Sequence, residues 1–377
     1  MQILNKLRNY FGLKIIGKSI NDNVDVLIAL GQKYFNQGNF VQSQFFFGKA
    51  LKLNPENVDY LNLYGQALHK NNQIELAVTI FRKAINNSPS DVRAYKNLGS
   101  IYLAQSEPRL AIELYSELLK VNPLFGEGYY LLGIIYYTLL NDQESAINYF
   151  KKAINFDPLN YQAYVYLGDI EYNNKHYDQA LIYYQKAVKV NNKAEEPFFK
   201  LGLLYEEKKN ENTAFNYFMR VLQLNEKHEK ALYKIGLYYD NKGNKDLAID
   251  YYKKVEKVNH DNPEVLFNIG AAYLKIDKLD LARSYLQRSV KNPKLARESK
   301  IQLAGILGHE EKFNEQIELL NSIHDKSQNN KVILSMLANA YGETHQSEKE
   351  MECYIELSKQ GDSDAIKWLK NKNVSIE

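Results

Sequence analysis

Apolar and small residues recur along this chain at the spacing of one helix face. Tyr95, Leu98 and Tyr102 lie three and four residues apart, and Ala111 and Tyr115 begin a second series with the same spacing. Side chains three and four residues apart share one face of an α-helix. The pattern therefore predicts two amphipathic helices joined by a short turn.

This helix pair is repeated through most of the sequence, and a glycine marks each copy. Successive glycines are 34 residues apart, with one interval of 35, and Ala304 and Ala338 continue the series at 34. Periods of 20 to 50 residues are typical of stacked arrays in which each unit packs mainly on its neighbours. The eight glycines are Gly31, Gly65, Gly99, Gly133, Gly168, Gly202, Gly236 and Gly270.

Glycine inside a helix is destabilising by roughly 0.5–1 kcal/mol relative to alanine, so its recurrence needs a physical reason. Close approach of the two helices is that reason. We expect the surface of Gly99 to receive the small side chain of Ala111 from the paired helix. A larger residue in place of the glycine would then overpack the contact by about 1–3 kcal/mol.

With Gly99 as position 8, apolar or small residues occupy positions 4, 7, 8, 11, 20, 24 and 27, and proline often follows at 32. This pattern resembles the tetratricopeptide repeat. The resemblance implies an all-α, right-handed superhelix of about ten helix-turn-helix units over residues 24–362. Residues 1–23 are interpreted as a short amphipathic helix or cap, and residues 363–377, with Trp368, as a C-terminal capping helix and tail. The fourth unit has one extra residue before Ala146, which predicts a longer turn between its helices.

Composition and motifs do not favour catalysis or cofactor binding. The seven histidines are dispersed, Cys353 is the only cysteine, and phosphate-binding and nucleophile motifs are missing from the sequence. No apolar run approaches 18 residues. We therefore expect a cytoplasmic protein that is not an enzyme, has no cofactor, metal or catalytic residue, and does not span a membrane.

In the resembled family the first helix of each unit lines a concave groove through positions 2, 5, 9, 12 and 13. Here the first two units place polar residues such as Asp59 and Asn62 at these positions, whereas the central units place apolar and aromatic ones there. An apolar strip with a polar rim is typical of a protein-binding surface. The predicted partner-binding residues are Tyr130, Ile134, Tyr137, Val165, Asp169, Tyr172, Phe199, Leu203, Tyr233, Leu237 and Phe267.

Acidic residues around this strip, including Glu127, Glu206, Glu207 and Asp240, predict a partner segment with apolar and basic side chains. The sequence thus favours a protein–protein interaction scaffold. Two alternatives stay open: the rings only thicken the packing between units, or the groove binds the chain's own N-terminal helix or another copy, giving a self-associating structural protein.

More specific ligands of the resembled family are not favoured. A clamp for C-terminal carboxylates needs lysine and asparagine at fixed positions, and only Lys96 complies, since Ser100 and Leu131 occupy the other two. A second mode of ligand binding in the resembled family needs asparagine at position 6 of repeat after repeat. Here only Asn97 and Asn268 occupy that position. The net charge of +3, from 48 basic and 45 acidic residues, does not indicate nucleic-acid binding.

Overall fold

The computed structural model describes residues 23–324, 331–372 and 374, which form 21 α-helices. The predicted cap over residues 1–23 lies outside the described residues, apart from Asn23. The chain divides into two large parts, each made of several helix pairs. These are the first unit, Met1–Asn192, and the second unit, Lys193–Glu377. The predicted domain limits themselves stay predictions.

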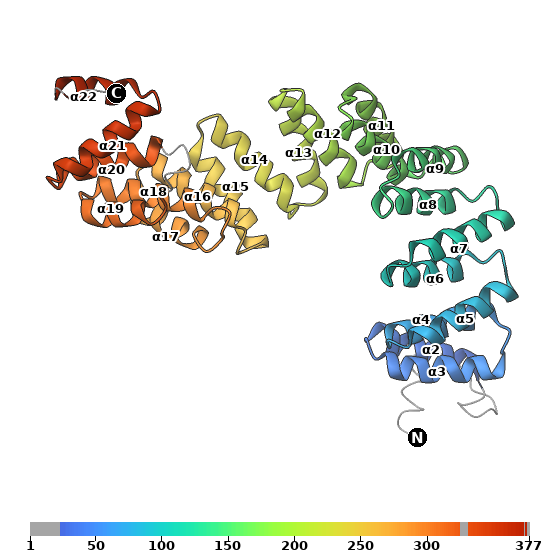
Figure 1. Ribbon diagram of the computed structural model, residues 1–377. Helices are drawn as coiled ribbons and strands as arrows, with labels where there is room; N and C mark the ends of the chain where they lie inside the picture. Colours follow the sequence, from blue (N-terminus) through green and yellow to red (C-terminus); the bar gives the residue numbers. More distant parts are fainter. Residues whose placement is uncertain (1–22, 325–330, 373, 375–377) are drawn as a thin grey trace. The chain divides into compact units, whose positions relative to one another are not determined.

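The helices of each unit follow one another in chain order (Figure 1). In the first unit they are α2 (Val24–Asn36), α3 (Phe40–Leu53), α4 (Val58–Lys70), α5 (Ile74–Asn87), α6 (Val92–Ala104), α7 (Pro108–Val121), α8 (Gly126–Thr138), α9 (Gln143–Phe156), α10 (Tyr161–Asn173) and α11 (Tyr177–Val190). In the second they are α12 (Glu195–Glu207), α13 (Glu211–Leu224), α14 (Glu229–Asn241), α15 (Lys245–Val258), α16 (Pro263–Lys275), α17 (Leu279–Ser289), α18 (Ala296–His309), α19 (Phe313–Asn321), α20 (Lys331–Glu343), α21 (Ser347–Lys359) and α22 (Ser363–Asn371).

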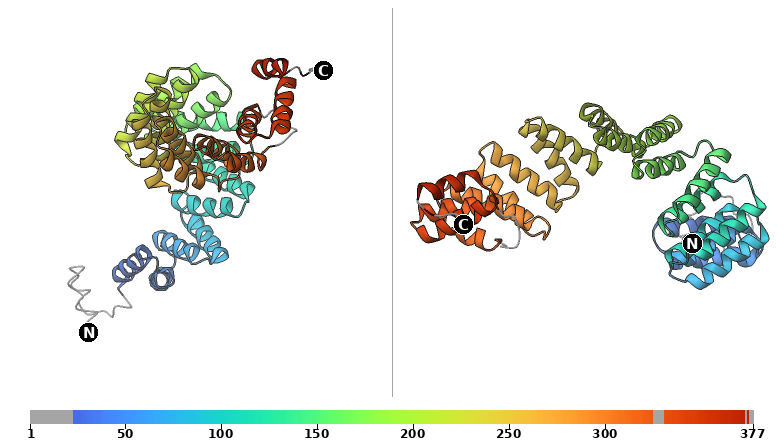
Figure 2. Two further views of the ribbon diagram at one scale, coloured as in Figure 1. Left: turned by 90° about the vertical axis from the view of Figure 1, so that its left-hand side faces the viewer. Right: turned by 45° about the horizontal axis from the view of Figure 1, so that its top comes forward.

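Neighbouring helices pack in pairs, and each pair packs on the next. In the first unit α2 contacts α3, α4 contacts α5, and α3 in turn contacts α4; in the second unit α14, α15 and α16 contact one another in the same order. The right view of Figure 2 shows this succession of helix pairs within each unit. The predicted all-α fold of tandem helix pairs is confirmed.

Short polar segments start and separate these helices. Asn57 accepts a hydrogen bond from the backbone N–H of Tyr60 and so caps the start of α4. Between the two helices of a pair, one turn residue adopts a positive φ, which favours glycine. Gly38 takes this place after α2 with φ 74°, whereas Asn72 takes it after α4 with φ 59°. The backbone geometry of the turn is therefore kept even where the residue is not glycine.

The repeated glycines do allow close packing, but their partner is not the predicted one. A Cβ at Gly99 would lie 2.1 Å from Oη and 2.4 Å from Cζ of Tyr115, at position 24, rather than first meeting Ala111. In the sixth helix pair a Cβ at Gly202 would lie 2.3 Å from Cε1 of Phe218, again at position 24. The expectation that Ala111 fills this space is wrong, because atoms of the aromatic side chain at position 24 are the nearest to the glycine.

Two local predictions agree with the structure. Four residues, Leu139 to Asp142, separate α8 from α9, whereas three separate α6 from α7, so the extra residue lengthens the turn. At the C-terminal end α22 packs on α21, where Trp368 stacks on Tyr354 with ring centroids 4.2 Å apart. Leu369 of α22 is fully buried.

Candidate protein-binding surface

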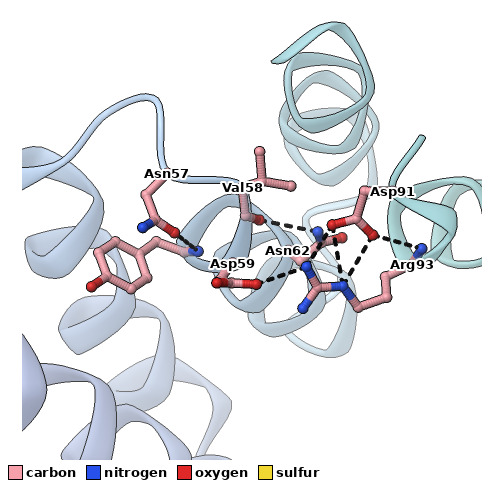
Figure 3. Close-up of polar contacts among 7 residues, drawn as sticks. Asn57, Val58, Asp59, Asn62, Asp91 and Arg93 are labelled. Atoms are coloured by element: carbon pink, nitrogen blue, oxygen red, sulfur yellow. Dashed lines mark hydrogen bonds and ion pairs between the residues drawn. The ribbon is translucent and has the colours of Figure 1, made fainter. Parts of the chain in front are cut away.

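The start of the first unit presents a polar cluster at two of the groove positions (Figure 3). Arg93 at the start of α6 reaches back to Asp59 on α4, with Nη2 2.7 Å from Oδ1, and also holds Asp91 at 2.5 Å. Hydrogen bonds from Arg93 lower the pKa of the Asp91 carboxyl. These charges are satisfied within the chain, so this end of the first-helix face is a polar, internally bonded surface.

Asn62 lies beside this cluster and is buried, with 2% of its surface exposed. Its Nδ2 donates to the carbonyl of Val58 at 3.0 Å, while its Oδ1 has no hydrogen-bond partner among the described residues. A buried polar residue at a groove position agrees with the predicted polar character of the first two helix pairs. It offers no apolar anchor site.

In the middle of the first unit, aromatic rings from α8, α9 and α10 form one cluster. Tyr130 lies 6.2 Å from Phe150 and 6.1 Å from Tyr166, measured between ring centroids. Phe150 stacks on Tyr166 at 5.0 Å, and Tyr137 meets the same Tyr166 edge-on at 5.9 Å. Ile134 packs at the margin of this cluster and is half-buried. The rings thus contribute to packing between pairs while keeping part of their surface exposed.

On α10 the three predicted residues differ. Val165 is 2% exposed, so the expectation that it forms part of an exposed strip is wrong, and it belongs to the core. Asp169 accepts a hydrogen bond from Tyr184 Oη at 2.7 Å. Burial first, and then the Asp169 charge, raise the pKa of Tyr184 well above its ordinary value. Tyr172 is half-buried and lies 5.6 Å from the ring of Tyr177.

In the second unit, α12, α14 and α16 carry the remaining predicted residues, all of them half-buried. Phe199 lies 5.5 Å from Phe218 and 5.0 Å from the imidazole of His228, between ring centroids. Tyr233 accepts a hydrogen bond from Asn268 Nδ2 at 3.0 Å. Leu203 on α12 and Phe267 on α16 complete the set.

A cavity of about 370 Å³ opens beside Leu237, between α12, α13 and α14. Phe215 and Phe218 of α13 line it together with Leu237, and the Lys234–Glu206 ion pair borders it at 2.5 Å. The two phenylalanines are not among the predicted residues, because the predicted groove positions lie on first helices only. Their positions on the inward face of a second helix were the available indication.

The acidic rim is partly neutralised by lysines of the same chain. Glu127 pairs with Lys96 at 2.6 Å, Glu206 with Lys234, and Asp240 of α14 with Lys245 of α15. Each pair is partly exposed, so its effect on stability is small. The surface is therefore less acidic than the residue types alone indicated.

Among the described residues, no group of three or more histidine, cysteine, aspartate or glutamate side chains is arranged to hold a metal ion. Within the same residues, no helix has the length and apolar character needed to cross a membrane. The geometry of these faces offers side-chain packing and hydrogen bonding to a ligand.

Comparison with family models finds tetratricopeptide repeats over most of the chain. All the matching models are described as tetratricopeptide or TPR repeats, and together they reach from residue 24 to residue 294. The matched ranges are 24–57, 46–79, 65–106, 96–158, 161–194, 196–228, 229–262 and 264–294.

Solved structures are similar to the chain at low identity. The APC/C hetero-tetramer Cut9-Hcn1 is 21% identical, with a TM-score of 0.46 over 76% of this chain and 56% of that one, so the chain spans little more than half of it. A tetratricopeptide repeat protein from Parabacteroides merdae is 18% identical, with a TM-score of 0.48 over 66% of this chain and 98% of that one. The C-terminal part of a TPR repeat-containing protein from Cytophaga hutchinsonii is 20% identical, with a TM-score of 0.48 over 62% and 97%. Comparison with curated proteins gave no match.

Proposed function

Because the chain belongs to the tetratricopeptide repeat family, a family of protein-interaction scaffolds, we propose that its first-helix face binds a partner segment through apolar anchors. The segment inserts an apolar side chain beside Leu237 and carries basic residues next to it. The proposal concerns the second unit, where apolar residues of the face and a cavity coincide.

The cavity beside Leu237 is the observation that carries this proposal. Its volume of about 370 Å³ is enough for one or two side chains, and its walls include Phe215, Phe218 and Tyr238. Interfaces concentrate their binding energy where an apolar or aromatic anchor fills such a pocket and excludes water. Tyr233 lies on the same helix as Leu237, α14, and Phe199 lies on the preceding first helix, α12; both are further contact points for an extended or helical segment.

Basic residues of the partner have a place at the ends of the first helices. Helix α12 ends in Glu206 and Glu207, and α14 has Asp240 in its last turn. Glu206 and Asp240 are already paired with Lys234 and Lys245, so it is Glu207, together with the partial negative charge at the C-terminal end of α12, that favours a cation. Glu207 is exposed, and no ion pair engages it among the described residues.

A peptide library displayed on phage, selected on the full-length protein, tests the proposal. We expect enriched segments to combine apolar residues with lysine or arginine. Leu237→Ala should weaken a selected peptide at least about tenfold in fluorescence polarisation, because it removes one wall of the anchor pocket. Leu247→Ala is the matched control, since Leu247 is 37% exposed on α15 and does not line the cavity.

Selected peptides that bind both variants as tightly as the unmodified protein would show that the segment lies elsewhere. If the peptides weakened by Leu237→Ala are acidic rather than basic, the charge argument is contradicted. Far-ultraviolet circular dichroism of each variant separates loss of binding from loss of folding.

A further inference from the structure

A second and larger hollow lies in the second unit, away from the cavity beside Leu237. Its volume is about 820 Å³, and it is formed mainly by the second helices α13 and α15. Met219 and Leu222 of α13 face Val258 at the end of α15, above Leu232 of α14. The two hollows share no lining residue. A ligand in one therefore leaves the other open.

The floor of this hollow is apolar and partly exposed. Leu232 at its base is 2% exposed, whereas Val258 at its edge is 44% exposed. Tyr251 adds a ring, and its hydroxyl lies 3.9 Å from Met219 Sδ. Burying exposed apolar surface of this kind against a ligand is favourable, because it removes that surface from water. The floor thus offers a contact for an apolar anchor of a ligand.

The border of the hollow is basic. Lys227, Lys254 and Lys257 line it, against a single carboxylate, Glu226. All three lysines are exposed, and in the part of the chain that the structure describes none of them forms an ion pair. Lys254 instead lies over the ring of Tyr251, with Nζ 4.3 Å from its centroid.

Nearby cations strengthen this bias. Arg220 on α13 donates to Oε1 of Gln223, a lining residue, at 2.8 Å. Among the acids of α15 outside the lining, Glu256 is paired with Arg288 at 2.6 Å, whereas the exposed Asp250 lies four residues before Lys254. An excess of positive charge around an apolar floor favours a ligand of opposite charge.

We propose that this hollow, formed by α13, α14 and α15, is a second protein-binding site, specific for an acidic segment with an apolar anchor. The anchor packs on Met219, Leu222 and Val258, and flanking aspartate or glutamate side chains pair with Lys254 and Lys257. The site differs from the first-helix face in helix set and in charge, so one chain can hold two segments of opposite charge. This inference stands independently of the proposed function.

Two fluorescein-labelled peptides on the full-length protein test the site. Both carry the same leucine–tryptophan anchor, flanked by aspartate and glutamate in one and by lysine and arginine in the other. We expect the acidic peptide to bind, and Lys254→Glu combined with Lys257→Glu to weaken it at least about tenfold in fluorescence polarisation. The basic peptide should bind the doubly reversed protein more tightly than the unmodified one, a gain that misfolding cannot produce.

The matched control is Lys186→Glu combined with Lys189→Glu on α11. These exposed lysines occupy the same places in the fifth helix pair and change the net charge by the same amount. The acidic peptide should keep its affinity in this control and in Leu237→Ala.

Three results would overturn the proposal. One is an equal loss of affinity in the α11 control, which would indicate a general charge effect. Another is a loss confined to Leu237→Ala, which would place the acidic peptide on the first-helix face. The third is no binding of the acidic peptide up to about 1 mM, an affinity of roughly −4 kcal/mol.

Discussion

Two helix-interior glycines of the second unit should respond to alanine in opposite directions. Gly202 of α12 faces Phe218, and a Cβ there would lie 2.3 Å from Cε1 and 2.8 Å from Cζ of that ring. Gly305 of α18 has room for a Cβ, since the nearest atom to it would be the terminal methyl of Met336 at 3.8 Å, an ordinary van der Waals contact. Both substitutions add the same single methyl group to a helix.

The expected magnitudes follow from two opposing effects. In a helix interior, alanine is favoured over glycine by about 0.8–1 kcal/mol, and Gly305→Ala should gain about this amount. At Gly202 the same gain is opposed by overpacking of about 1–3 kcal/mol, because Phe218 is buried at 2% exposure and has little room to move. Gly202→Ala should therefore lower the free energy of unfolding, by up to about 2 kcal/mol.

Urea unfolding followed by circular dichroism gives the midpoints, and hydrogen exchange resolved by mass spectrometry gives the location. Repeat arrays do not always unfold as one cooperative unit, so exchange in α12 and α13 should be compared with exchange in α18. Gly202→Ala should speed exchange in the first region, and Gly305→Ala should slow it in the second. If both variants stabilise the protein, the ring does not press on the glycine, and the explanation of the repeated glycines is wrong.

Other predictions concern tyrosines and turns. Tyr184→Phe should cost about 1–2 kcal/mol in urea unfolding because it removes a hydrogen bond to a carboxylate, whereas Tyr252→Phe should be neutral or stabilising because its buried hydroxyl has no partner among the described residues. Burial raises the pKa of Tyr115 to about 12, whereas the pKa of tyrosine in the unfolded chain is about 10. The stability that the neutral Tyr115 side chain contributes is therefore complete below about pH 10 and is lost as the pH rises to about 12. Urea midpoints should fall over that range, and less steeply in Tyr115→Phe. Ser106→Gly should raise the free energy of unfolding by relieving a φ of 61°, and Gly38→Ala should lower it at a φ of 74°, each by about 0.5–1 kcal/mol. The thermal midpoints of the two variants should therefore shift in opposite directions, and shifts of one sign would contradict this.

Much of the fold could be predicted because the repeat constrains it many times over. Helix pairing, the longer turn before α9 and the helix containing Trp368 all followed from the spacing of apolar residues and single insertions. The partner of the glycines could not be predicted in this way. Spacing identifies which residues share a helix face, but which of them reaches the glycine depends on the length of the side chain. The long side chain of Tyr115 reaches Gly99, whereas the methyl group of Ala111 does not come as close.

The predicted binding face shows a similar limit. Position 5 is occupied by Tyr130, Phe199, Tyr233 and Phe267, whose rings are long enough to stay partly exposed while packing at their base. Val165 has the same position but a short side chain, and its neighbours cover it. Ion pairs across helices, such as Lys234 with Glu206, were equally beyond the pattern, because they join residues 28 apart in sequence.

The residue at position 24 of the second helix and the residue at position 9 of the first helix depend on each other, and this dependence differs between the fifth and seventh helix pairs. A tyrosine at position 24 brings a hydroxyl beneath position 9 of the first helix, and a buried hydroxyl needs a partner. In the fifth pair, Asp169 at position 9 supplies it to Tyr184. In the seventh, Leu237 occupies position 9, and the hydroxyl of Tyr252 has no partner among the described residues. The carboxylate of Asp169 thus accepts a hydrogen bond from its own helix pair and supports the fold, whereas the side chain of Leu237 forms no hydrogen bond and lines a cavity instead. For this reason Leu237, rather than Asp169, is the residue whose substitution should separate partner binding from folding.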